Sequence, residues 1–193
     1  MIDKTNMMPI ISELYCSSYQ TMFVVRRRPY VVNGGGFVVM DCSAQRVLFR
    51  VHGRTVLGTK GDLILRTEDG DALLFMRRKG GMVEALSIYK EWKGYTFSYQ
   101  GSQIVVFSLK EPNSCLVKNN TIRISTWNRG LDFKINGSFP DKCCSIVDSG
   151  GNKVAHLVGE DLNERKGLYY VVVKPGIDQA FVFGVIAMLD YIY

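Results

Sequence analysis

The twenty residues that end the chain constrain its fold most, because they include a long stretch without a polar side chain. A segment rich in β-branched residues ends at Lys174-Pro175-Gly176, where proline lacks a backbone donor and glycine tolerates unusual backbone angles. Asp178 follows and suits the start of a helix, because the free N–H groups there favour an anion. Residues 180–189 then carry no polar side chain at all.

This apolar stretch predicts a helix that must be buried on every side or lie in lipid. Ten residues of helix rise about 15 Å, whereas the hydrocarbon core of a bilayer is about 30 Å thick. The stretch is therefore too short to span a membrane, and Asp178 and Asp190 flank it with charge. We expect a buried helix that the rest of the protein encloses.

Short segments rich in β-branched and aromatic residues fill the chain before that helix. Turn residues separate these segments, a spacing that is typical of antiparallel hairpins. The turns are expected at 34–36, Gly53, 69–70, Gly94, Gly101, Gly137 and 149–152. The predicted strands are 37–40, 47–51, 62–66, 73–76, 104–109, 121–125, 131–135, 144–147, 154–158 and 168–173.

An internal repeat supports the hairpin interpretation. Residues 39–51 align without gaps on residues 146–158, so that Asp41 matches Asp148, and residues 66–76 fit the same unit of strand, tight turn and returning strand. Repeated hairpins and one wholly apolar helix predict a mainly β fold, a closed antiparallel barrel with the helix threaded through it. Closure removes the sheet edges, and the helix fills a lumen too wide for side chains alone.

Five segments of the chain are distinctive in combination. They are GFVVMDCSAQRVLFRV (36–51), LRTEDGDALLFMRRK (65–79), YKEWKGY (89–95), GSFPDKCCSIVDSGGNKVAHLV (137–158) and PGIDQAFVFGVIAMLDYIY (175–193). In these segments the sequence resembles the LURP-one-related family of plant proteins, within the tubby-like C-terminal superfamily that also includes phospholipid scramblases. The resemblance covers most of the chain from about residue 36.

The resemblance implies a barrel of about twelve strands around a central C-terminal helix, without known catalytic activity. The family is linked to plant defence, and the superfamily suggests membrane-tethered or phosphoinositide-binding regulators, sometimes associated with transcription. This chain departs from the pattern in its first turn, 42–45, which lacks a glycine, and at Thr67, where aspartate is usual. No lipid-binding motif of tubby proteins can be matched here residue by residue.

The sequence predicts a weakly patterned N-terminal tail, 1–22, followed by a single barrel domain, 23–193. Five cysteines occur, an odd number without a C-x-x-C spacing, and we expect free thiols in a reducing compartment. The N-terminus does not resemble a secretory signal. We therefore expect a cytoplasmic protein, peripheral to a membrane or nuclear in part, that is neither secreted nor membrane-spanning.

Signals for enzyme chemistry are few. His52 and His156 lie in or beside predicted strands, where structural roles are expected. Asp41 and Asp148 occupy equivalent turn positions, where an aspartate caps its own turn. The residues show no nucleophile elbow, P-loop or metal-ligand cluster, so we expect no catalytic residue, no cofactor and no metal.

Basic clusters are the best functional candidates in a chain with a net charge of +6. Cations beside an aromatic ring suit a lipid interface, where charge meets the headgroups and the ring lies at the boundary. The candidate lipid-binding residues are Arg26, Arg27, Arg28, Arg77, Arg78, Lys79, Lys90, Trp92 and Lys93. The alternative is a solvated face that keeps the protein soluble, and a buried Trp92 would belong to the core.

Two functions compete. The first is a non-enzymatic regulatory domain of plant defence or stress signalling that binds an anionic membrane surface or phosphoinositide and has a transcription-related role. The second is a protein-interaction scaffold without lipid or nucleic-acid binding. Direct contact with nucleic acid is not expected, because a strand-rich barrel offers no basic helix for the major groove. We expect a monomer.

Overall fold

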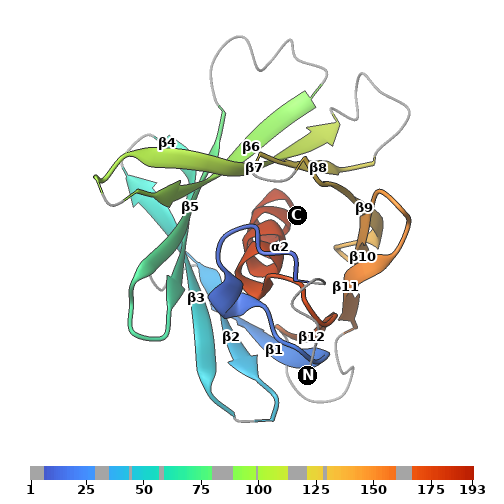
Figure 1. The fold of residues 1–193 in the computed structure, drawn as a ribbon. Coiled ribbons are helices and arrows are strands. Elements are labelled where there is room, and N and C mark those ends of the chain that lie inside the picture. Colours follow the sequence, from blue (N-terminus) through green and yellow to red (C-terminus); the bar gives the residue numbers. More distant parts are fainter. Residues whose placement is uncertain are drawn as a thin grey trace.

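A closed barrel surrounds the C-terminal helix in the computed structural model of the chain (Figure 1). The structure describes residues 7–28, 35–43, 45–56, 59–79, 89–98, 100–112, 121–127, 130–159 and 167–193. Twelve strands are formed by these residues: β1 (Thr21–Arg27), β2 (Gly36–Asp41), β3 (Val47–Val56), β4 (Thr59–Thr67), β5 (Ala72–Arg78), β6 (Tyr89–Phe97), β7 (Gln103–Pro112), β8 (Arg123–Thr126), β9 (Asp132–Ser138), β10 (Cys143–Asp148), β11 (Lys153–Val158) and β12 (Leu168–Val173).

Each strand pairs antiparallel with its neighbours in the chain, and the first strand pairs with the last. Thr21 of β1 lies opposite Val173 of β12, and Arg26 lies opposite Leu168. The sheet therefore has no free edge. The predicted fold class, a mainly β closed antiparallel barrel around a buried C-terminal helix, is confirmed.

Helix α2 (Gln179–Ile192) runs through the barrel, and every residue from 180 to 189 is buried. Its aromatic side chains fill the lumen: the ring of Phe181 lies 5.1 Å from that of Phe107, and the ring of Phe183 lies 5.1 Å from that of Phe23. Gly184 allows close approach to β5, because a Cβ atom there would lie 2.5 Å from Leu74 Cδ2. The helix and the inward residues of the strands thus form one core.

The internal repeat is also a structural repeat. A β-bulge lies at the equivalent point of three hairpins, between Val39 and Met40, between Leu65 and Arg66, and between Ile146 and Val147. A β-bulge inserts one extra residue and increases the local twist, which helps a sheet to curve into a barrel. Repetition of the same bulge supports a common geometry for these three hairpins.

The two departures at the turns have different consequences. Thr67 does what aspartate does in the last hairpin: its hydroxyl accepts the backbone N–H of Asp71 at 3.1 Å, as Asp148 Oδ1 accepts that of Asn152 at 2.8 Å. The first turn instead contains one more residue, and Gln45 adopts a φ of 51° there. The gap-free alignment of that hairpin with the last one is therefore wrong by one residue in the returning strand.

The N-terminal segment, defined as residues 7–20, crosses one end of the barrel, where it includes the short helix η2 (Glu13–Tyr15) (Figure 1). The sequence indicated only a weakly patterned tail, but Ile10 is buried in the core. Asp178, the N-cap of α2, accepts hydrogen bonds from the backbone N–H groups of Ile10, Ile11 and Ser12 at 2.6–3.0 Å. The segment is thus fastened to the helix through its backbone, which leaves little trace in the pattern of side chains.

The described cysteines are thiols, and two of the strands were not predicted. None of the four described cysteines is joined in a disulfide, and Cys115 lies outside the described residues. Cys143 is exposed and Cys144 buried, on opposite faces of β10. Strands β1 and β6 were not among the predicted strands, and β1 begins two residues before the expected domain boundary.

Candidate anion-binding surface

The three arginines that end β1 point in different directions. Burial alternates along this strand, so that Phe23 and Val25 line the core while Arg26 is exposed on the outer face. Arg27 forms an ion pair with Asp190 near the end of α2, where the guanidinium joins the strand to the helix. Arg28 follows the strand and is half-buried. The triplet therefore does not form one uniform basic surface, because Arg27 is held in an ion pair and Arg28 is half-buried.

The second basic triplet, at the end of β5, is largely paired with carboxylates. Arg77 donates to Asp62 at 3.1 Å and lies over the ring of Phe75 on the outer face. The hydrogen bond to Asp62 raises the pKa of Arg77, which stays charged. Lys79 lies 3.7 Å from Glu91 of β6. Arg78 is half-buried and lies opposite Trp92 in the strand register.

Trp92 is completely buried, and its predicted position at a lipid interface is wrong. The side chain is on the inner face of β6, where its ring packs edge-on against Tyr191 of α2 with the centroids 5.1 Å apart. Lys90 lies two residues earlier and is half-buried. Lys93 is on the opposite, outer face, because successive side chains of a strand alternate.

The predicted clusters do not share one face of the barrel. Strands β2, β3 and β4 lie between β1 and β5, so the two triplets are four strand spacings apart. At about 4.8 Å for each spacing, that separation is roughly 19 Å along a curved sheet. The two triplets therefore lie on separate parts of the barrel.

A different set of cations does lie together. Lys110 of β7 is directly opposite Arg123 of β8, and Arg123 is directly opposite Lys134 of β9. All three are exposed, and the alternation in β8 places Arg123 and Ser125 outside and Ile124 inside. Side chains at directly opposed positions have Cβ atoms about 5 Å apart. We call these three residues the cationic row.

The cationic row has no acidic partner among the residues that the structure describes. Glu91 lies opposite Lys110, but the ion pair that it forms is with Lys79. Like charges directly opposite one another destabilise a sheet, by about 0.2 to 1 kcal/mol for each pair. An anionic ligand bound at the row would relieve the repulsion between its cations.

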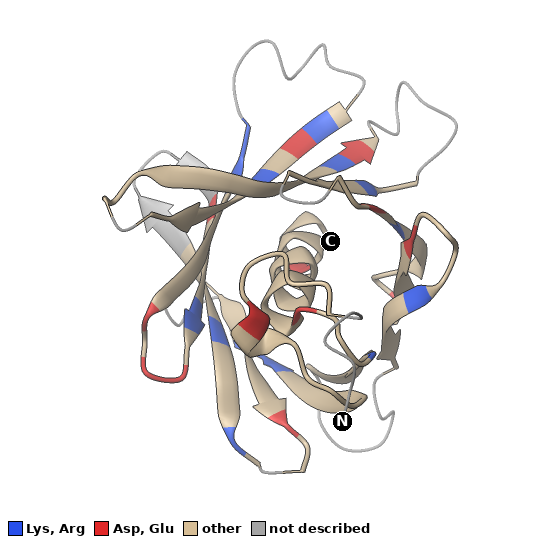
Figure 2. Cartoon of the chain, in the orientation of Figure 1, with Lys and Arg blue, Asp and Glu red and all other residues tan. Residues whose placement is uncertain are grey.

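An exposed hydroxyl and an aromatic ring lie near the cationic row. Two residues along the same outer face, Lys93 is opposite Ser108, which is buried, and Ser108 is opposite the exposed Ser125. The ammonium of Lys93 lies 5.9 Å from the ring centre of Trp127, which is 56% exposed. Trp127, and not Trp92, is thus the tryptophan available at the surface. Figure 2 shows basic and acidic positions interspersed on the neighbouring strands of this side of the barrel.

The sequence contained only part of the signal for this row. Arg123 and Lys134 lie in predicted strands, but Lys110 follows the predicted end of another strand. Their juxtaposition depends on the register of β7, β8 and β9, which hydrogen bonds between distant parts of the chain define. Runs of adjacent basic residues are visible in a sequence, whereas rows across strands are not.

Other chemistry-bearing groups do not converge on this face. His52 lies in β3 and His156 in β11, and burial together with nearby cations lowers the pKa of each imidazole. Within the described ranges, no group of three His, Cys, Asp or Glu residues could hold a metal ion. Among the described helices, none is long and apolar enough to cross a membrane.

Comparison with known proteins gives consistent matches over nearly the whole length. The model of the LURP-one-related family matches residues 21–190. Protein LURP-one-related 6 of Arabidopsis thaliana is 53% identical over 188 residues, covering 97% of both chains. Protein LURP-one-related 16 of the same plant is 45% identical over 202 residues, covering 96% of this chain and 93% of the relative.

A solved structure supports the fold. The crystal structure of a protein from Arabidopsis thaliana is similar with a TM-score of 0.65 and covers 95% of this chain and 98% of that chain. The two sequences are 19% identical, so this likeness concerns the fold alone.

Proposed function

The chain belongs to the LURP-one-related family, and we propose that it is a non-enzymatic regulatory domain of plant defence or stress signalling that binds anionic membrane surfaces. The observation that carries the proposal is the cationic row, Lys110, Arg123 and Lys134, which adjacent strands hold side by side on an exposed face. The defence setting is supported only by the family resemblance.

The row has the chemistry that phosphate headgroups require. Each Lys or Arg near an anionic bilayer contributes about 1 kcal/mol, so the three together contribute about 3 kcal/mol. Lys93 adds a fourth cation, and Trp127 presents an amphipathic ring to the interface. We expect weak and reversible binding that fades with salt, because exposed charges are screened over about 8 Å at physiological ionic strength.

The decisive experiment is vesicle co-sedimentation with the variant Arg123→Glu. The change puts a carboxylate between Lys110 and Lys134. Each lysine is then opposite an anion, so both cross-strand pairs become attractive where they were repulsive. We expect the free energy of unfolding to rise by about 0.5 to 2 kcal/mol. The loss of two units of charge, about 2 kcal/mol at the membrane, should weaken binding to phosphatidylserine vesicles roughly 30-fold.

Arg26→Glu is the matched control, because it makes the same charge change on β1, on a distant part of the barrel. It should leave vesicle binding nearly unchanged. Equal loss of binding in both variants would show that net charge alone is responsible. Retention of wild-type binding by Arg123→Glu, or no binding of the wild-type protein to any vesicle, would contradict the proposal.

A protein-interaction scaffold is the second candidate function, and one observation favours it. Phe97 of β6 and Ile104 of β7 are each 47% exposed at the end of the sheet where these strands connect, and the register, which pairs Phe97 with Gln103 and Ile104 with Thr96, places them on opposite faces. Exposed apolar groups on neighbouring strands suit a protein partner. This function would be favoured if the wild-type protein does not bind vesicles but binds a protein partner, and if Phe97→Ser abolishes the binding of that partner.

A further inference from the structure

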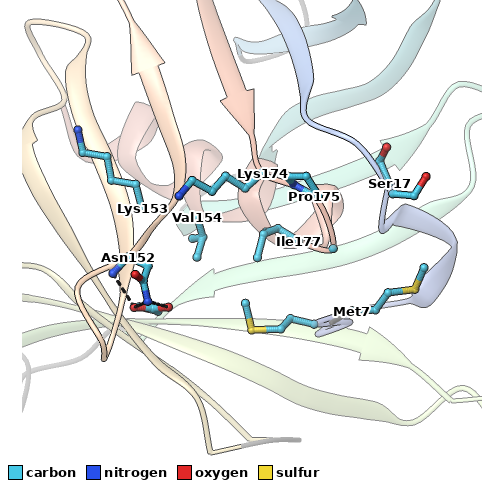
Figure 3. Close-up of a pocket in the computed structure, with 12 residues that line it drawn as sticks. Met7, Ser17, Asn152, Lys153, Val154, Lys174, Pro175 and Ile177 are labelled. Atoms are coloured by element: carbon cyan, nitrogen blue, oxygen red, sulfur yellow. Dashed lines mark hydrogen bonds between the residues drawn. The ribbon is translucent and has the colours of Figure 1, made fainter. Parts of the chain in front are cut away.

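A cavity lies at the end of the barrel that the N-terminal segment crosses. Its volume is about 280 Å³, near the lower end of the range for small-molecule sites. Its walls come from the N-terminal segment, from the turn before β11 and from the link between β12 and α2 (Figure 3). The residues that line the cavity come from other segments of the chain than the cationic row, and no residue of the row lines it.

The lining has an apolar side and a polar edge. Met8, Val154 and Ile177 bring apolar side chains, while Ser17 and Lys174 bring a hydroxyl group and an ammonium group. Figure 3 shows Met7 across the cavity from Val154 and Ile177, with Lys174 along one edge. A ligand here would therefore meet apolar surface over its body and a cation at one end.

Backbone hydrogen bonds hold the walls in place. The N–H of Met8 donates to the carbonyl of Gly176 at 2.7 Å, and the N–H of Gly176 donates to the carbonyl of Ser17 at 2.7 Å. Close beside them, the carboxylate of Asp178 fastens the same segment to α2. The cavity is thus pre-formed, which lowers the entropic cost of binding.

The lining carries two lysines, Lys153 and Lys174, and one carboxylate, Asp148. Asp148 is the carboxylate in the lining, and its oxygens already accept hydrogen bonds from the backbone and side-chain nitrogens of Asn152 at 2.8 and 3.1 Å. Lys153 and Lys174 form no ion pair with any other described residue. After burial, these two ammonium groups are the causes that lower the pKa of His156.

We propose that this cavity binds a small amphiphilic anion, with its acidic head at Lys174 and its apolar body against Met8, Val154 and Ile177. The ligand class is set by the lining, an apolar enclosure with a cation at one edge. At about 30 Å³ for each water-sized group, the volume accommodates about ten non-hydrogen atoms. This site is independent of the membrane-binding surface.

Octanoate is the probe, and octanamide is its uncharged counterpart of the same length and shape. In calorimetric titrations of the full-length protein we expect octanoate to bind at least about tenfold more tightly than octanamide, since a salt-bridged head group is worth more than about 1.4 kcal/mol in a partly enclosed site. The double variant Lys153→Gln, Lys174→Gln should reduce octanoate affinity to that of octanamide. Lys110→Gln, which removes a cation elsewhere, should not.

An NMR titration of the histidines supplies a second readout. The chain has two histidines, and His156 is the one in the field of Lys153 and Lys174. A bound anion offsets that field, so octanoate should raise the pKa of His156. His52 is the internal control, because the cations that lower its pKa are Arg28, Arg66 and Arg50.

Each outcome decides. Tighter binding of octanoate than octanamide, lost in the double variant and accompanied by the shift at His156, supports the proposal. Equal binding of the two probes would show an apolar cavity without anion selectivity and would overturn it. Failure of octanoate to bind, or binding that survives in the double variant, would overturn it as well, whatever the vesicle experiments show.

Discussion

Two adjacent residues on β10 differ greatly in chemical character. Cys143 is exposed and Cys144 is buried, because successive side chains of a strand point to opposite faces. Burial raises the pKa of the Cys144 thiol to about 11, although the positive charge of Lys142 opposes this change. The thiolate is the nucleophile of a cysteine, so Cys144 is protected both by enclosure and by protonation.

This difference predicts the order of alkylation. With limiting iodoacetamide at pH 8, Cys143 should be labelled well before Cys144, as mass spectrometry of peptides can show. The thiolate fraction of Cys144 should grow about tenfold for each pH unit up to 11, because that is where its pKa lies. Urea should remove the difference by exposing both thiols. Equal labelling rates in the folded protein at pH 8 would contradict the burial of Cys144.

At the scale of secondary-structure elements, the side chain of Asp178 connects the N-terminal segment to α2 by hydrogen bonds. Its carboxylate is fully buried and accepts backbone N–H groups from three consecutive residues of the N-terminal segment and from Phe181 in the first turn of α2. Burial raises the pKa of this carboxyl, and the four N–H groups act in the opposite direction. One side chain thus satisfies the start of the helix and the segment that covers the barrel end.

Removal of this carboxylate should therefore be costly. Asp178→Ala leaves four N–H groups without their acceptor, and we expect the free energy of unfolding to fall by at least about 2 kcal/mol. Urea denaturation followed by circular dichroism measures the change. Asp148→Ala is the control, because that carboxylate serves an exposed turn. Equal stability of the two variants would mean that the N-terminal segment is not fastened through Asp178.

These elements also show what a sequence can reveal. The apolar helix and the repeated hairpins were predictable, because burial on all sides and alternation leave direct patterns in residue type. The role of residues 7–20 was not, because main-chain groups make its contacts. Trp92 was misplaced, because a ring between Lys90 and Lys93 looks amphipathic until the pleat of β6 turns it inward. The cationic row depends on register between strands, which single segments do not encode.

At the scale of the whole molecule, a charged substitution in the enclosed helix α2 tests whether the barrel surrounds it. Ile186 is buried near the middle of α2 within the closed barrel. Ile186→Asp would place an unpaired charge in the core at a cost of about 3 to 5 kcal/mol, a large share of the roughly 5 to 15 kcal/mol that stabilises a domain. We expect the variant to be unfolded or nearly so in thermal and urea denaturation.

The exposed variant Tyr191→Asp is a useful comparison, since Tyr191 lies in the last turn of the same helix and is 40% exposed. It should remain folded with a smaller loss of stability. A folded Ile186→Asp protein with α2 accessible to protease would refute the enclosed helix.

Closure of the barrel between its first and last strands also has a consequence for biosynthesis. A ribosome delivers β1 first, but its partner β12 and the helix that fills the lumen come from the final part of the chain. Until that part emerges, the inward faces of eleven preceding strands have nothing to close around, and their apolar surface is open to chaperones and to aggregation. Folding of the barrel is therefore expected to complete only after α2 has emerged from the ribosome, and premature stop codons even a few residues before α2 should yield chains that the cell degrades.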